Sequence, residues 1–262
     1  MNERFDGIVL FRRKHRENDA LVKVFTNTYG TKMFFVKGLQ KPNHPLHTQL
    51  IPLTFNRYVG NINQEGLSFL KEATTLDFHR QIQSDYKKQA YASYVAQLVD
   101  AAIEDNSVDQ SLYNMFNKAI DLIENNSFYE IITVAMEIKL LKYFGSEVNF
   151  RECLVCQSRS QPFDFSVRLH GVLCQQHYCE DDFRLQIHPR AMYIASMLDA
   201  ITFNQIQSIN VSYETTKELR RLMDEIFKEY VGIHLKSKSY LDNLEALSQS
   251  MEKVIRKRKN SN

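Results

Sequence analysis

The first third of the chain alternates short apolar runs with turn-prone polar stretches. The runs are rich in Val, Ile, Leu and Phe, which favour strands, and they occupy residues 7–11, 20–25, 32–36, 53–59 and 67–70. In the second run, Leu21, Lys23 and Phe25 share one face of a strand, because side chains alternate between its two faces. Five short strands without a long helical pattern predict a small closed barrel of the OB-fold type, since a sandwich needs about seven strands.

From residue 76 onward the apolar period changes to three and four residues, which predicts helices. The predicted helices occupy residues 79–104, 108–125, 128–144, 189–202 and 213–231. The segment 128–144 is apolar around almost its whole circumference, so we expect it at the centre of a helical domain. The predicted fold class is α+β. Its parts are an OB-fold domain at 1–78, an α-helical domain at 79–250 with an inserted zinc-binding hairpin at 151–182, and a basic tail at 251–262.

The composition of the 262 residues is that of a globular protein, with 44% hydrophobic and 24% charged residues. No apolar run approaches the ~18 residues that span a bilayer, and the first residues carry charges of both signs, unlike a secretory signal. We therefore expect a cytoplasmic protein, associated with the nucleoid if it binds DNA.

The formal net charge of +2 conceals a segregation of charge along the chain. Residues 1–80 carry 12 Lys and Arg against 7 Asp and Glu, a balance of +5, and the last twelve residues add +4. The segment 81–250 carries −7. This asymmetry indicates a basic N-terminal module that meets a polyanion, joined to an acidic body. For the basic tail, a solvated and frayed end is the favoured interpretation.

All four cysteines lie within 27 residues, as Cys153-Leu-Val-Cys156, Cys174-Gln-Gln-His177 and then Cys179. Two such knuckles, 17 residues apart, can close around one zinc ion, because each turn directs two ligands at the metal. The apolar alternation before Gly171 predicts a hairpin between them. The expected site is structural, with one Zn²⁺ per chain held by Cys153, Cys156, Cys174 and His177, and with Cys179 as the rival fourth ligand.

Signatures of catalysis are missing from the sequence. The glycines form no dinucleotide-binding, P-loop or nucleophile-elbow motif. Glu137-Ile-Lys139 matches the E-x-K motif of some nucleases, but its place in the most apolar helix favours a helical ion pair. No catalytic residues are therefore assigned, and the sequence favours a binding protein over an enzyme.

Basic residues gather at the strand ends and loops of the predicted barrel. Such residues replace counterions along phosphates, while nearby exposed rings can stack on bases, as a single-strand groove requires. The rings considered are Phe11, Phe34, Phe35 and Tyr58, although most of the phenylalanines must belong to the core, and any one cation could be ordinary solvated surface. The expected DNA-binding residues are Arg12, Arg13, Lys14, Arg16, Lys32, Lys37, Lys41 and Arg57.

Several fragments, in order along the chain, resemble a known family, the bacterial recombination mediator RecO. They are Gly7-Ile-Val-Leu10, Glu17-Asn-Asp19, Val36-Lys37-Gly38, Glu137-Ile-Lys-Leu-Leu141, the two cysteine knuckles, and Tyr230-Val-Gly-Ile-His-Leu-Lys-Ser-Lys238. The resemblance implies an OB-fold followed by a helical domain with a zinc segment. It also implies binding of single- and double-stranded DNA, annealing of complementary strands, and loading of RecA with RecR onto DNA coated by single-stranded-DNA-binding protein.

The resemblance extends to particular residues. Lys37 and Lys41 match basic positions after the third barrel strand of the family. Position 177 departs from the family, because many members have cysteine there, which keeps Cys179 a rival ligand. Family members also bind the acidic tail of single-stranded-DNA-binding protein through the helical domain. Lys139 and Lys142 are the residues considered for that contact, with snorkelling to solvent as the equal alternative.

The favoured function is thus a non-enzymatic DNA-binding and annealing mediator. Two alternatives remain open at this stage. One is a metal-dependent nuclease or RNA-processing enzyme that uses the same barrel and zinc scaffold. The other is a zinc-stabilised scaffold that binds only protein.

Overall fold

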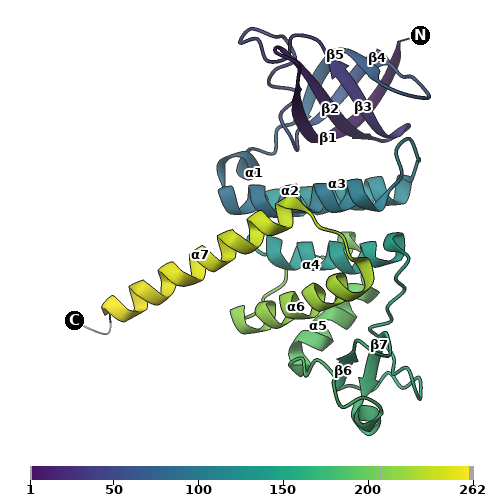
Figure 1. Cartoon of the computed structure of the whole chain (residues 1–262), viewed down its shortest axis with the longest axis vertical. Coiled ribbons are helices and arrows are strands. Elements are labelled where there is room, and N and C mark those ends of the chain that lie inside the picture. The colour runs from purple at the N-terminus through teal and green to yellow at the C-terminus, as the bar shows by residue number, and fades with distance from the viewer. Residues whose placement is uncertain (1, 207, 260–262) are drawn as a thin grey trace. The chain divides into compact units, whose positions relative to one another are not determined.

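The computed structural model describes residues 2–206 and 208–259. Its N-terminal part is a closed five-stranded barrel (Figure 1). The strands are β1 (Glu3–His15), β2 (Asp19–Thr26), β3 (Gly30–Val36), β4 (Phe55–Asn61) and β5 (Ser68–Asp77). They follow one another around the barrel in the order β1-β2-β3-β5-β4, and the pairing of β3 with β5 is parallel, whereas the others are antiparallel. A five-stranded Greek-key barrel is the OB-fold architecture, so the predicted fold class is confirmed.

Two strands extend well beyond their predicted ends. Strand β1 continues to His15 because Arg12, Arg13 and Lys14 keep pairing with β2, although their side chains are polar. Strand β5 continues to Asp77 by pairing with β4. Polar strand segments of this kind lie outside the apolar pattern, so that pattern could not reveal them.

The barrel interior is filled by alternate residues of each strand. In β2, Ala20, Val22 and Val24 point into the barrel core. Aromatic side chains close that core, where the Phe5 ring stacks with Phe34 at 5.7 Å and with Tyr58 at 5.4 Å between centroids. The strand alternation predicted for residues 20–25 is therefore confirmed.

The chain folds as two compact units. The first unit contains the residues up to Tyr113 and those from His234 onward, and the second contains Asn114–Ile233. Besides the barrel, the first unit holds α1 (Arg80–Ser84), α2 (Tyr86–Ala102) and α7 (Lys236–Lys259). Helix α2 packs on β1 and on α7, which explains why these helices belong with the barrel.

Helix α7 was not among the predicted helices. It has few apolar residues, although Leu241 is buried and the Tyr91 hydroxyl of α2 donates a hydrogen bond to Glu245 Oε1 at 2.5 Å. The helix continues through residue 259, so the frayed tail expected from residue 251 is instead helical to that point. Residues 260–262 of the expected tail lie outside the described residues.

The second unit is mainly helical. Helix α3 (Gln110–Asn125) begins in the first unit and continues into this one, and is followed by α4 (Tyr129–Leu140) with a 3₁₀ turn η1 (Leu141–Phe144). The later elements are α5 (Pro189–Ala200), the 3₁₀ turn η3 (Phe203–Gln205), α6 (Tyr213–Ile226) and the π-helical turn η4 (Phe227–Val231). Helix α4 packs against both α5 and α6 and is buried along nearly its whole length, which confirms its predicted central place.

The predicted hairpin between the cysteine knuckles is present. It consists of β6 (Phe163–Ser166) and β7 (Gly171–Cys174), which pair antiparallel, followed by the short 3₁₀ segment η2 (Gln175–Glu180). All eight strand residues are buried, and β6 packs on α5 (Figure 1). The hairpin is therefore anchored to the helices of its own unit.

Candidate metal centre and nucleic-acid interface

The two cysteine knuckles bring four ligands together. One ligand atom from each of Cys153, Cys156, Cys174 and His177 lies within 4.8 Å of the others. Cys156 and Cys174 place their Sγ atoms 3.8 Å apart, and His177 Nδ1 lies 3.7 Å from Cys153 Sγ and 3.2 Å from Cys174 Sγ. The fourth position in this cluster is taken by His177, whereas Cys179 is exposed and outside it.

These separations can be compared with a tetrahedral zinc site. Zn–S bonds of about 2.3 Å and Zn–N bonds of about 2.0–2.1 Å put tetrahedral S···S edges near 3.8 Å and S···N edges near 3.6 Å. The S···S distance matches, and the two S···N distances lie on either side of the expected edge. A Cys₃His set with this spacing can hold a zinc-sized metal ion.

The thiols of the cluster favour cation binding. Burial raises the pKa of the Cys153 thiol. Hydrogen bonds from the backbone of Cys174, Cys156 and Val155 and from the Cys174 thiol outweigh burial and lower this pKa to about 6. Burial and the neighbouring thiols raise the pKa of Cys174. The cluster thus carries negative charge near neutral pH, which a divalent cation neutralises.

On the barrel, the structure gathers three of the expected DNA-binding residues. Arg16, in the β1–β2 turn, lies with Lys37 and Lys41, in the loop after β3, around a hollow of 230 Å³. We call these three residues the loop cluster. The two loops are joined by hydrogen bonds, from Gly38 N to Asp19 Oδ1 at 2.8 Å and from Gln40 N to the Asn18 carbonyl oxygen at 2.9 Å.

Gly38 has a specific backbone role in this arrangement. Its φ of 73° lies in the left-handed region, which glycine adopts without strain. This turn lies between Lys37 and Lys41, and the Lys41 side chain passes close to the glycine. Glu17 and Asp19 line the same hollow, so its three cations outnumber its carboxylates by one.

The remaining expected cations differ in their availability. Arg13 and Lys14 are exposed at the end of β1, and Arg12 is partly buried and donates a hydrogen bond to the His47 carbonyl oxygen at 3.4 Å. Arg57 is exposed, but its guanidinium pairs with both carboxylate oxygens of Asp6, at 2.8 and 2.9 Å. Arg13 and Lys14 are therefore the more accessible cations of this group.

Lys32 corrects the expectation of an exposed cation on β3. It is only 5% exposed, and its ammonium group donates a hydrogen bond to the Asn63 carbonyl oxygen at 2.9 Å. Burial lowers its pKa, and nearby Asp105 opposes this shift. Lys32 shares the inward face of β3 with Phe34 and Val36, so closure of the barrel buries it.

The rings expected to stack on bases also divide into two groups. Phe34 and Tyr58 are fully buried in the barrel core, which corrects their assignment as exposed rings. Phe11 and Phe35 are partly exposed. The structure adds Phe69, 45% exposed, which the sequence analysis did not select. The apolar run at 67–70 signalled a strand there, but the ring's direction depends on pairing with β3.

The helical unit contains both expected partner-binding lysines, and in it the ion pair of Glu137 differs from the expected one. The Lys139 ammonium group donates a hydrogen bond to the Asp199 carbonyl oxygen at 2.5 Å, and burial lowers its pKa. Lys142 is exposed, 5.0 Å from the centre of the Tyr143 ring. Glu137, for which an ion pair within its own helix was expected, pairs with Arg220 of α6 at 2.7 and 2.8 Å.

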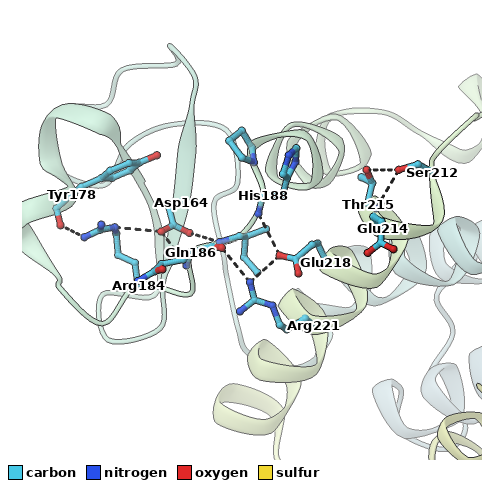
Figure 2. A pocket seen from close by; sticks show the side chains of 12 residues that line it. Asp164, Tyr178, Arg184, Gln186, His188, Ser212, Glu214, Thr215, Glu218 and Arg221 are labelled. Carbon is cyan, nitrogen blue, oxygen red and sulfur yellow. Dashed lines mark hydrogen bonds and ion pairs between the residues drawn. The ribbon is translucent and has the colours of Figure 1, made fainter. Parts of the chain in front are cut away.

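A larger hollow, of 770 Å³, lies in the helical unit beside the hairpin. Figure 2 shows the side chains that line it. Its arginines are bound to neighbouring groups of the same unit. Arg184 pairs with Asp164 at 3.3 Å, and Arg221 binds Glu218 at 2.8 Å as well as the Leu185 carbonyl oxygen at 2.8 Å. These contacts hold the segment between the hairpin and α5 in place, so the charges here have a structural role.

Comparison with known proteins decides the family. The model described as Recombination protein O N terminal matches residues 1–79, and the model described as Recombination protein O C terminal matches residues 83–239. The DNA repair protein RecO of Streptococcus thermophilus is 40% identical over 247 residues, which cover 94% of this chain and 95% of that protein. The DNA repair protein RecO of Streptococcus pyogenes serotype M1 is 41% identical over 238 residues, covering 91% and 94%.

This chain belongs to the RecO family of DNA repair proteins. Membership in the RecO family gives it a role in DNA repair and recombination. The N-terminal RecO match covers the whole barrel, and the C-terminal match includes the Cys₃His cluster and the hairpin that carries it. Among the described residues of this RecO protein, no helix combines the length and apolarity needed to cross a bilayer.

Proposed function

We propose that this RecO family protein is a non-enzymatic recombination mediator. It binds single- and double-stranded DNA, anneals complementary strands, and assists RecR in loading RecA onto DNA coated by single-stranded-DNA-binding protein. The observation that carries the DNA-binding part is the loop cluster, where Arg16, Lys37 and Lys41 surround one hollow on a barrel whose architecture binds oligonucleotides in other proteins. The exposed Arg13 and Lys14 extend this positive surface along β1.

The proposed mechanism is charge neutralisation. Complementary strands repel each other through their phosphates, and cations that replace the condensed counterions reduce that repulsion. Strands held close together on the basic surface can then nucleate base pairs without hydrolysis of a nucleotide. This step requires no general base, which agrees with the absence of catalytic motifs in the sequence.

A structural zinc ion belongs to the proposal. The Cys₃His cluster would hold one Zn²⁺ per chain, and the bound ion would fix the knuckles to the hairpin of β6 and β7. All four protein ligands are present, and structural zinc sites are closed in this way, whereas catalytic sites keep one position for water. The metal would thus contribute folding energy and no chemistry.

The proposed contact with the acidic tail of single-stranded-DNA-binding protein centres on Lys142. Its ammonium group is exposed, whereas that of Lys139 is bound to the Asp199 carbonyl oxygen. Lys139 therefore supports the end of α5, and Lys142 supplies the charge for an acidic partner.

Reversal of two loop-cluster charges tests the DNA-binding proposal. In K37E/K41E, affinity for DNA should fall for all sequences and the dependence of log Kd on log salt should become shallower, because fewer counterions are released. A charge-matched control is K217E/K236E, which reverses two exposed lysines of α6 and α7 that do not line the hollow. Equal affinity and salt slope in K37E/K41E and in the unmodified protein would show that the loop cluster does not bind DNA.

A separate assay tests the nuclease alternative. Cleavage of labelled DNA with Mg²⁺ that survives further purification would support that alternative instead.

A further inference from the structure

Three rings meet on the outer face of the barrel. Phe35 of β3 and Phe69 of β5 are direct partners in the parallel strand pair, and their ring centroids are 6.2 Å apart at an interplanar angle of 78°. His15, at the end of β1, meets Phe35 edge to face at 5.9 Å and 90°. We call His15, Phe35 and Phe69 the ring cluster.

The ring cluster is not needed to fill the barrel. The interior is already closed by the stacked rings of Phe5, Phe34 and Tyr58. Phe69 is 45% exposed, and Phe35 and His15 are partly exposed. Large aromatic side chains usually lie in cores or at binding surfaces, so an exposed ring beside two others indicates a binding role.

Cations border the ring cluster on two sides. Strand register places Arg13, Leu21, Phe35 and Phe69 in one row across β1, β2, β3 and β5, and Arg13 is exposed at the end of that row. Arg16 directly follows His15 in the chain, and Lys37 lies two residues after Phe35. Rings and cations therefore lie within the same part of the barrel. A single-stranded nucleic acid needs both, because cations bind its phosphates and rings stack on its bases.

We infer that the ring cluster is a base-stacking subsite for single-stranded DNA, with Phe69 as its principal ring. The edge-to-face arrangement directs the rings at one another and leaves ring surface of Phe69 open to solvent. Single strands can place an unstacked base on this surface, whereas the bases of a duplex are already stacked and paired. The inference rests on the proposed function and adds to it a stacking contact that single-stranded DNA can make and a duplex cannot.

The test compares Phe69→Ala with Leu76→Ala in the full-length protein. Leu76 is an apolar residue of the same strand and is 44% exposed, so its substitution controls for loss of apolar surface. Affinity is measured for an oligothymidine strand, for an abasic strand of equal length and for a duplex. Phe69→Ala should weaken binding to oligothymidine by roughly 5- to 150-fold, because stacking contributes about that factor per base. Phe69→Tyr should retain the affinity.

The abasic strand separates this inference from the proposed function. If stacking operates, Phe69→Ala binds the abasic strand as tightly as the unmodified protein does, and the same holds for the duplex. Leu76→Ala then matches the unmodified protein on all three DNAs. If Phe69→Ala leaves oligothymidine binding unchanged, or weakens all three DNAs alike, the subsite is refuted while DNA binding stands. Failure of the unmodified protein to bind any of the three DNAs at low salt would refute both proposals.

Discussion

The Arg220 guanidinium of α6 binds both carboxylate oxygens of Glu137 in α4, at 2.7 and 2.8 Å. Both side chains are buried. Glu137→Ala removes the bidentate partner of this buried guanidinium, whose contact with Asp224 Oδ1 is longer, at 3.5 Å. Loss of one partner of a buried ion pair typically costs about 3–5 kcal/mol. We therefore expect Glu137→Ala to lower the free energy of unfolding by about that amount, measured by urea denaturation.

The double variant Glu137→Leu/Arg220→Met tests the cause of that loss. Replacement of a buried ion pair by apolar residues of similar volume is often neutral or stabilising, so this variant should be more stable than Glu137→Ala. If the double variant is as unstable as Glu137→Ala, the loss reflects packing around α4 and not an unpaired charge.

The metal cluster makes a prediction that discriminates between its cysteines. Cys153 is buried within the cluster, whereas Cys179 is exposed and outside it. Elemental analysis of the purified protein should find about one zinc per chain, lost in Cys153→Ser and retained in Cys179→Ser. A full complement of zinc in Cys153→Ser would contradict the assignment, and loss in Cys179→Ser alone would make the rival cysteine the ligand.

An ion pair inside the first unit predicts a pH dependence. Lys23 of β2 lies 2.5 Å from Asp100 Oδ1 and 2.6 Å from Asp105 Oδ1. Burial lowers the pKa of Lys23, but the two carboxylates outweigh burial and raise it above 10.5. Because the folded-state pKa exceeds that of the unfolded chain, the charged lysine stabilises the fold below about pH 10.5, and this contribution fades as pH rises through the folded-state pKa.

The corresponding experiment compares Lys23→Met with the unmodified protein by chemical denaturation across pH. The difference in unfolding free energy should stay constant between neutral pH and about pH 9 and should shrink above pH 10.5. A difference that grows in strong alkali would contradict the sign of the shift.

Lys142 provides the prediction for the protein partner. Lys142→Glu should weaken binding of a peptide with the acidic tail of single-stranded-DNA-binding protein, because an exposed cation becomes a like charge. Binding measured by fluorescence anisotropy should fall most at low salt, where exposed charges are least screened. The control is Lys217→Glu, an exposed lysine on α6. Equal weakening by both variants would show a general effect of charge and not a site.

The sequence predicted the barrel, the central helix and the metal cluster because each depends on local spacing. Alternation placed β2 correctly, and the knuckle spacing selected the ligands that the structure brings together. Lys32 was misplaced because its inward direction depends on barrel closure. Phe69 was missed for a related reason, since its place beside Phe35 follows from a parallel pairing of distant strands.

Long-range charge pairs were equally inaccessible to the sequence. Glu137 and Arg220 are 83 residues apart, and no periodicity connects them. Helix α7 was missed because its sequence has few apolar positions, and its packing on α2 became visible only in the structure. These features depend on how elements meet, whereas local spacing describes each element alone.

Strand annealing tests the central proposal most directly. Two complementary labelled strands, bare or coated with single-stranded-DNA-binding protein, are mixed with the purified protein in the absence of nucleotide. The protein should accelerate duplex formation in both cases, and K37E/K41E should do so much less than K217E/K236E. Annealing at the rate of the protein-free reaction, under low-salt conditions in which the protein binds both strands, would contradict the account.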